Sequence, residues 1–369
     1  MWRIRKRMDM KKSLVILCLA ALLPLSGCGT VQEIMASEEM TINTTEELYQ
    51  QVGKALKEGK KEVAFVTEDL SQEDLNLLNQ EHDGFYGSVT QYEIKTVKML
   101  DRSYVTLSCD ISDNYYVKEA LLNGSEIPQE RREAAELREV CEEILAVISE
   151  EKSAYKKEKK IHDYLVENVA YGYPEGVESE DSNAYNAYGA LVQGKAVCNG
   201  YAQAMKLLCD LGGVECELIT GTADGENHAW NLIRLDDDAW YHVDVTWDDP
   251  EPDDPERLLY SYFNLNDTQM AQSHVWEAAD FVPAEGTKYQ YYRKNDLYCE
   301  DMDAFKEKCA EIFDEDAPDH FQVLVGDYEE NRYSEQNLQF IFEYSGARYI
   351  HLQTIGEKPY TTLYFTLEY

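Results

Sequence analysis

Three segments decide the fold of this chain: GKAVCNGYAQAM at residues 194–205, NHAWN at residues 227–231 and WYHVDVTWDDP at residues 240–250. The first contains Cys198, the second His228 and the third Asp244. A cysteine, a histidine and an aspartate can divide the work of nucleophilic catalysis, provided that the fold brings them together.

Cys198 opens a stretch with helical spacing. The stretch ends at Gly212-Gly213, a typical C-terminal stop signal, so we predict a helix that begins at Cys198. The unsatisfied amide groups and the dipole of a helix N-terminus favour a thiolate, which is the nucleophilic form of cysteine. For this residue taken alone, the alternative is a buried cysteine that packs as a small apolar side chain.

Residues 228–234 and 240–245 are short, partly alternating and rich in β-forming residues, and three aspartates lie between them. This pattern predicts a β-hairpin. If the turn centres on Asp237, His228 lies diagonal to Asp244; if it centres on Asp236, the two are direct partners. Both registers leave them on one face of the hairpin, within reach of one hydrogen bond. Asp244 would then orient His228, which in turn would activate the cysteine.

The three segments resemble the transglutaminase-like superfamily, in its bacterial exported branch. The resemblance covers roughly residues 155–276. It implies a papain-like core, in which a helix packs on an antiparallel sheet. It also implies the roles of the three residues: Cys198 as nucleophile, His228 as base and Asp244 as orienting acid.

Other residues near the predicted triad carry weaker signals. Animal transglutaminases have a tryptophan directly after the cysteine, where this chain has Asn199, so hydrolysis or transfer at an amide is favoured over cross-linking. Gln193 stands near the position of an oxyanion-hole glutamine in papain-like enzymes, and the backbone N–H of Cys198 is the other candidate donor. Trp230 is expected either to line a substrate groove or to pack in the core. His242 is expected either to lie beside the site or to pack in the core, rather than to act as the base.

The chain is strongly acidic, with 71 Asp and Glu against 34 Lys and Arg and a formal net charge of −37, which argues against nucleic acid as a partner. Residues 1–27 combine a basic start with a short apolar run, and the sequence that ends at Cys28 resembles the lipobox of bacterial lipoproteins. We predict a signal peptide, a lipid on Cys28 and a place on the extracytoplasmic face of a bacterial cell membrane. An ordinary signal peptide and a short membrane anchor are the alternatives.

No metal site and no cofactor are predicted. The cysteines show no C-x-x-C spacing, and the acidic run at residues 248–256 lacks the glycine turn of a calcium loop and is expected to be solvated. Six cysteines are expected to be buried apolar residues, with a Cys299–Cys309 disulfide as the alternative: Cys109, Cys141, Cys209, Cys216, Cys299 and Cys309. Five histidines have no assigned partner: His82, His162, His274, His320 and His351.

The fold class is predicted to be α+β, with two small α+β domains that flank the core in the same order of helices and strands. The first has helices at 45–57 and 71–79 and strands at 62–67, 89–97 and 103–111. The second has helices at 303–313 and 334–342 and strands at 321–325, 348–354 and 361–367. The predicted divisions are a tether at 28–44, an N-terminal domain at 45–124, a catalytic domain at 125–278 and a C-terminal domain at 279–369.

The sequence therefore predicts a surface lipoprotein that hydrolyses or transfers a peptide or isopeptide amide through a cysteine thioester. Its substrate would be a protein or peptide, cell-wall peptides included. The alternative is a non-catalytic surface lipoprotein that uses the same fold and its flanking domains to hold a protein or cell-wall ligand.

Overall fold

The computed structural model describes residues 40–369 apart from residues 58–59, 72–73, 76–88, 100–101, 175, 177–178, 180–181, 250–253, 255–256, 316–317 and 357–359. The predicted signal peptide, Cys28 and most of the tether lie outside the described residues, as does most of the helix predicted at 71–79. In the described part of the chain, no helix is long and apolar enough to span a bilayer.

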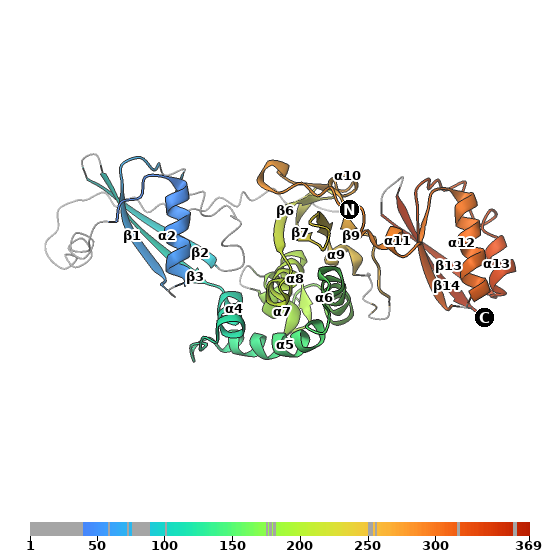
Figure 1. The fold of residues 1–369 in the computed structure, drawn as a ribbon, viewed down its shortest axis with the longest axis horizontal. Coiled ribbons are helices and arrows are strands. Elements are labelled where there is room, and N and C mark those ends of the chain that lie inside the picture. The colour runs from blue at the N-terminus through green and yellow to red at the C-terminus, as the bar shows by residue number, and fades with distance from the viewer. Residues whose placement is uncertain are drawn as a thin grey trace.

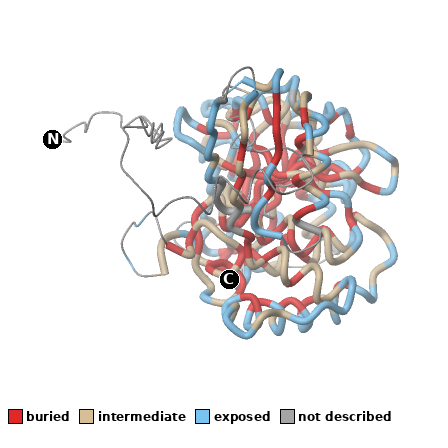
Figure 2. The backbone as a smooth tube through the Cα atoms, turned by 90° about the vertical axis from the view of Figure 1, so that its left-hand side faces the viewer, coloured by how far each residue is buried: buried red, intermediate tan, exposed pale blue. Residues whose placement is uncertain are grey.

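The chain folds into a central α+β body with a small helix-and-sheet unit on each side of it (Figure 1). In Figure 2, buried residues gather in the interior of the molecule, and exposed residues follow the outer helices and loops. The α+β class predicted from the sequence is confirmed.

The N-terminal unit packs one helix on a three-stranded antiparallel sheet. Its elements are α2 (Thr45–Lys57), β1 (Glu62–Thr67), β2 (Val89–Met99) and β3 (Arg102–Ile111), with strand order β1-β3-β2. Leu48 of the helix and Phe65 of β1 are buried in one apolar cluster, so the helix covers one face of the sheet. A capping box is present at Ser71, because the Ser71 backbone N–H donates to the Asp74 carboxylate at 2.7 Å and the Asp74 N–H donates back to the Ser71 hydroxyl at 3.1 Å.

The C-terminal unit repeats this topology. Its elements are β11 (Tyr298–Cys299), α12 (Met302–Glu315), β12 (His320–Val325), α13 (Phe340–Ser345), β13 (Tyr349–Ile355) and β14 (Thr361–Glu368). The order β12-β14-β13 with antiparallel pairing matches β1-β3-β2, and β11 adds a parallel strand at the edge. The two units therefore share strand order and direction, as the sequence predicts.

The second helix of the C-terminal unit begins later than the sequence predicts. It begins at Phe340, whereas the sequence predicts it at residues 334–342. The preceding residues form turns in which the N–H of Asn337 bonds the carbonyl of Ser334 at 2.9 Å. Apolar residues three apart share a face in such turns as well as in an α-helix, so their spacing alone does not separate the two.

The central body is a helical layer on a five-stranded antiparallel sheet. The main helices are α4 (Asp113–Asn123), α5 (Arg132–Ile148), α6 (Ala154–Asn168), α7 (Ala187–Leu191) and α8 (Cys198–Gly212). The sheet has the order β10-β6-β7-β8-β9, from β6 (Cys216–Ala223), β7 (Glu226–Arg234), β8 (Trp240–Val243), β9 (Phe263–Leu265) and β10 (His274–Val275). Short elements complete it: β4 (Ala170–Tyr171), β5 (Lys195–Ala196), α9 (Val245–Asp248), α10 (Asp267–Met270) and α11 (Tyr291–Lys294).

Helix α8 is central to this body because it lies against β6 and β7 and is also contacted by α5, α6 and α7. Met205 and Leu208, one helical turn apart, are fully buried on its inner face. Truncating a buried leucine of this kind to alanine costs about 2–5 kcal/mol of stability. The helix ends at Gly213, whose φ of 71° is the left-handed conformation that glycine adopts without strain. Val117 of α4 lies in the same core, so α4 belongs with the central body although the sequence groups it with the N-terminal domain.

The β7–β8 hairpin is fixed to the helical layer by its turn. The carboxylate of Asp236 accepts hydrogen bonds from the backbone N–H groups of Ala154 at 2.9 Å and Tyr155 at 3.1 Å, and from the hydroxyl of Ser153 at 2.9 Å. These are the first groups of α6, where amides have no partner within the helix. The carboxylate therefore ties the hairpin that carries His228 to the start of α6.

Candidate active site

The first element of the site is the start of α8, where the structure places Cys198 as predicted. The residue before it, Val197, makes no side-chain cap, so the first N–H groups of the helix remain available there. Gly200 allows a preceding segment to cross this helix start, because a Cβ on Gly200 would lie 2.4 Å from the carbonyl oxygen of Ala184. Among the cysteines whose side chains the structure describes, Cys198 is the one that is not buried.

The second element is the β7–β8 hairpin, whose register pairs Asn231 with Val243 and Arg234 with Trp240. The turn therefore centres on Asp237, which is the first of the two registers that the sequence leaves open. The chain leaves the sheet earlier than predicted, since β8 ends at Val243 and Asp244 becomes the N-cap of α9.

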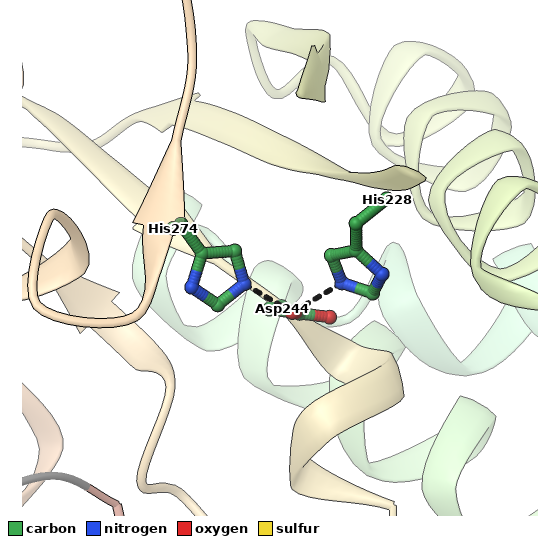
Figure 3. A group of neighbouring side chains, drawn as sticks. All are labelled: His228, Asp244 and His274. Atoms are coloured by element: carbon green, nitrogen blue, oxygen red, sulfur yellow. Dashed lines mark hydrogen bonds and ion pairs between the residues drawn. The ribbon is translucent and has the colours of Figure 1, made fainter. Parts of the chain in front are cut away.

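His228 and Asp244 form a direct hydrogen-bonded pair. Nε2 of His228 lies 2.7 Å from Oδ2 of Asp244, and Oδ1 of Asp244 accepts the backbone N–H of Trp247 at 3.3 Å. The side chain of Cys198 also interacts with the same imidazole and helps to raise its pKa. Figure 3 shows the second ring nitrogen of His228 directed away from Asp244. One ring nitrogen therefore serves the carboxylate, and the other is left for the cysteine.

The charges of this pair support each other. Burial opposes the charged imidazole, but the charge and hydrogen bond of Asp244, together with Cys198, raise the pKa of His228 to about 10. Burial alone would also raise the pKa of Asp244, yet the charge of His228 and the hydrogen bonds from His228 and His274 hold it well below its ordinary value. The pair is therefore an imidazolium–carboxylate pair at neutral pH. The His228 side chain keeps 8% of its surface exposed, whereas that of Asp244 keeps 1%.

The chain matches the family model of the transglutaminase-like superfamily over residues 142–245. Residues 142–245 are a transglutaminase-like domain. Cys198, His228 and Asp244 all fall inside the matched range, and Asp244 is its penultimate residue.

Two curated relatives match this part of the chain. Kyphoscoliosis peptidase of Mus musculus is 26% identical over 113 residues, which are 27% of this chain and 17% of that protein. Kyphoscoliosis peptidase of Homo sapiens is 30% identical over 82 residues, which are 19% of this chain and 12% of that protein. The matched part is therefore less than a fifth of either relative. The crystal structure of a TGase aligns with this chain over 57% of this chain and 59% of the TGase chain, at 14% identity and a TM-score of 0.28.

The two weaker candidates of the sequence lie differently in the transglutaminase-like domain. Trp230 is buried, with 1% of its surface exposed, and its indole N–H donates to Nδ1 of His242 at 3.0 Å. Trp230 therefore packs in the core beneath the site, the second of the two places expected for it, and does not line a groove. Gln193 is exposed in the turn after α7, and its role as an oxyanion donor stays a prediction.

Sequence reasoning missed one residue of the site, His274. Its Nε2 lies 3.0 Å from Oδ2 of Asp244, the same oxygen that His228 contacts. His274 lies on a two-residue strand outside the range matched by the family model. A strand this short has no periodicity, so no local signal in the sequence points to its place.

Proposed function

We propose that this protein is a cysteine-dependent enzyme that cleaves a peptide or isopeptide amide through a thioester on Cys198. The observation that carries the proposal is the position of His228, which bonds Asp244 at 2.7 Å on one side and has the Cys198 thiol as a partner on the other. This is the geometry in which a histidine moves a proton between a nucleophile and a leaving group while a carboxylate holds its orientation.

In the first half-reaction, the Cys198 thiolate attacks the amide carbonyl carbon and the charge moves to the carbonyl oxygen. The N–H groups at the start of α8 supply donors for that oxygen. The C–N bond then breaks, and the His228 imidazolium gives its proton to the departing amine. The products of this step are a free amine and a thioester on Cys198.

In the second half-reaction, neutral His228 takes a proton from water as the water oxygen attacks the thioester carbonyl. The C–S bond breaks, the acid is released and the thiolate–imidazolium pair returns. An amine in place of water would give transfer. We favour hydrolysis, since the relatives that match the domain are named peptidases.

The substrate class and location follow from the charge and the N-terminal sequence. A net charge of −37 disfavours nucleic acid, so we propose a protein or peptide substrate, cell-wall peptides included.

We also propose that a lipid on Cys28 holds the protein on the extracytoplasmic face of a bacterial membrane. In Cys28→Ala, the protein should leave the membrane fraction or remain an unprocessed precursor. Unchanged attachment of a processed Cys28→Ala protein would remove the anchor from the proposal.

The test of the catalytic proposal is labelling with an alkyne-tagged iodoacetamide at mildly acidic pH, where ordinary thiols are mostly protonated. Wild-type protein should label rapidly at Cys198, and Cys198→Ala should not label. Cys209→Ala is the matched control, because Cys209 is also on α8 but is buried, and this variant should label like the wild type. Slow labelling of wild-type Cys198 that is indifferent to His228→Ala would favour a non-catalytic binding protein.

A further inference from the structure

Asp244 holds two histidines rather than one. Nε2 of His228 lies 2.7 Å from its Oδ2 atom, and Nε2 of His274 lies 3.0 Å from the same atom (Figure 3). The two imidazoles approach the carboxylate from opposite sides, one from β7 and one from β10. His274 and Asp244 are both fully buried, so neither the ring nor the carboxylate has water as a substitute partner.

The sheet builds this arrangement through β6. His274 pairs with Ala223 of β6, and His228 pairs with Gly221, two residues along the same strand. Residues two apart on a strand share a face, so the two histidines point to the same side of the sheet. Gly221 permits the approach of β10, because a Cβ there would lie 2.2 Å from the carbonyl oxygen of Val275.

The proton positions follow from the partners. An ionised carboxylate can only accept hydrogen bonds, so Nε2 of each imidazole must carry a hydrogen toward Asp244. On the other side of the His274 ring, the hydroxyl of Ser273 lies 2.8 Å from Nδ1. A neutral His274 therefore accepts a hydrogen bond from Ser273 and donates one to Asp244, and the two contacts select the same tautomer.

We propose that His274 is a positioning residue of the active site. Its N–H gives Asp244 a second strong donor at Oδ2, which fixes the carboxylate against the His228 imidazolium and lowers its tendency to take the proton. This inference rests on the proposed function, since His274 acts only through Asp244 and His228. His274 lies on β10, outside the residues that match the family model, so the proposed active site extends beyond the matched range.

A divalent cation is the rival explanation for this cluster. The ligand atoms of His228, Asp244 and His274 lie within 4.8 Å of one another. However, both ring nitrogens lie at hydrogen-bond distance from one oxygen, whereas ligands at about 2.0–2.2 Å from a shared zinc ion surround it. A cation would also displace the Nε2 proton of His228 and so disable the proposed acid–base cycle.

The test separates thioester formation from its hydrolysis. p-Nitrophenyl acetate acylates a reactive thiol without needing a proton for its leaving group, and mass spectrometry then follows loss of the acetyl group from Cys198. In His274→Phe, which keeps a ring and removes the donor, deacylation should slow by about tenfold, the scale of a lost hydrogen bond to a charged group. His274→Gln, which can return an N–H to the Nε2 position, should recover most of that loss. Alkylation of Cys198 by iodoacetamide should change much less in both.

Two further variants keep the test independent of folding defects. His242→Phe is the matched control: His242 is equally buried and bonds Asp267 at 2.9 Å, but it has no hydrogen bond to Asp244 among the described contacts. It should reduce thermal stability and leave deacylation near the wild-type rate. Gly221→Ala leaves His274 intact but displaces β10 and presses on the Trp230 ring beside His228, so it should slow deacylation at least as much as His274→Phe.

The outcomes separate this inference from the proposed function. If His228→Ala abolishes deacylation but folded His274→Phe deacylates at the wild-type rate, the inference is overturned and the proposed function stands. Failure of His274→Gln to recover any rate would assign His274 a packing role only. If EDTA changes the deacylation rate of the wild-type protein, the result would favour a bound cation. If wild-type Cys198 does not acylate at all, the proposed function itself fails.

Discussion

Two histidine–aspartate pairs lie at opposite ends of α9, a helix of a single turn: a partly exposed pair at its start and a buried pair at its end. Asp244 caps its start and bonds His228, whereas Asp248 ends it and bonds His162 of α6 at 3.2 Å. Asp248 is thus buried, although the sequence places it in a solvated loop. The two pairs share their residue types and their helix, and they differ in what lies on the far side of each imidazole.

That far side decides what each pair can do. Nδ1 of His162 is taken by Asp163 at 3.2 Å, so both nitrogens of this ring face carboxylates. The ring is also packed between Tyr260 and Phe263 and has no exposed surface. His228, by contrast, has a thiol as its second partner and keeps some exposure. A histidine–aspartate pair becomes a proton carrier only where one ring nitrogen is left for a reacting group.

The electrostatics agree with this division. Burial opposes the charge on His162, but its bonds to Asp163 and Asp248 raise its pKa to about 9. Burial raises the pKa of Asp248 to about 6, even though His162 and the N–H of Tyr262 act in the opposite direction. At neutral pH the His162 pair is therefore charged and closed on itself, which suits a structural tie between α6 and α9.

The largest effect should come from removing the proton carrier. His228→Ala is expected to lower amide hydrolysis by about 10⁶-fold, as loss of a catalytic histidine does in related chemistry. Thermal stability should change much less than activity. Peptide-library cleavage read by mass spectrometry, with a thermal melt of the same sample, makes the comparison. A His228→Ala protein that retains wild-type cleavage would end the distinction drawn between the two pairs.

Asp244→Asn should have the next largest effect, a loss of about 10⁴-fold in hydrolysis. Asparagine keeps the cap of α9, because it is as good an N-cap as aspartate, but it cannot stabilise the His228 imidazolium or hold its tautomer. Alkylation of Cys198 should fall less than hydrolysis. Parallel measurement of both rates checks the split, and equal losses would contradict the orienting role.

The buried pair should respond in stability rather than in chemistry. His162→Phe leaves the carboxylate of Asp248 buried without its partner and should cost about 3–5 kcal/mol of unfolding free energy. Labelling of Cys198 in the folded fraction should fall by less than tenfold. Adding Asp248→Asn should recover part of the stability, because the uncompensated charge is removed. Urea unfolding of the three proteins measures this, and a purely catalytic defect in His162→Phe would reverse the assignment.

A smaller effect is expected in the pH dependence of stability. The pKa of His162 rises from about 6.5 in the unfolded chain to about 9 in the folded protein. The folded protein then binds the proton more tightly, so this contribution is complete below about pH 6.5 and is lost as the pH rises through 9. Its full size is roughly 3 kcal/mol. Urea unfolding measured between pH 6 and 9.5 should therefore show that the unfolding free energy falls less steeply with rising pH in His162→Phe than in the wild type. An identical slope would mean that His162 carries no raised pKa.

The sequence predicts one of these pairs and misses the other for a physical reason. The start and stop signals of one helix predict that Cys198 lies at its N-terminus. The pairing register of one hairpin, which depends on the number of residues in a short turn, predicts that His228 and Asp244 share a face. These are local signals. His162 lies on α6, yet its partner comes from a segment far along the chain. Only the packed fold determines that contact, as it does for His274.

The same division holds for the elements themselves. Strands with clear alternation and helices with a clear start are predicted within one or two residues, as for α2, β1 and β14. The end of β8 is misjudged because Asp244 turns away from the sheet to cap α9, a preference that alternation does not encode. The first residue of α13 is missed because turns precede it.

The single turn of α9 also bears on how this sequence can evolve. The N–H of Asp248 bonds the carbonyl of Asp244 at 3.2 Å, so a substitution that shifts one aspartate shifts the other. Selection for chemistry at Asp244 would therefore extend to His162, a residue that no substrate would touch. Variation at the buried pair should be tolerated only in combinations that keep the pitch of this turn, and insertions or deletions between residues 244 and 248 should be purged.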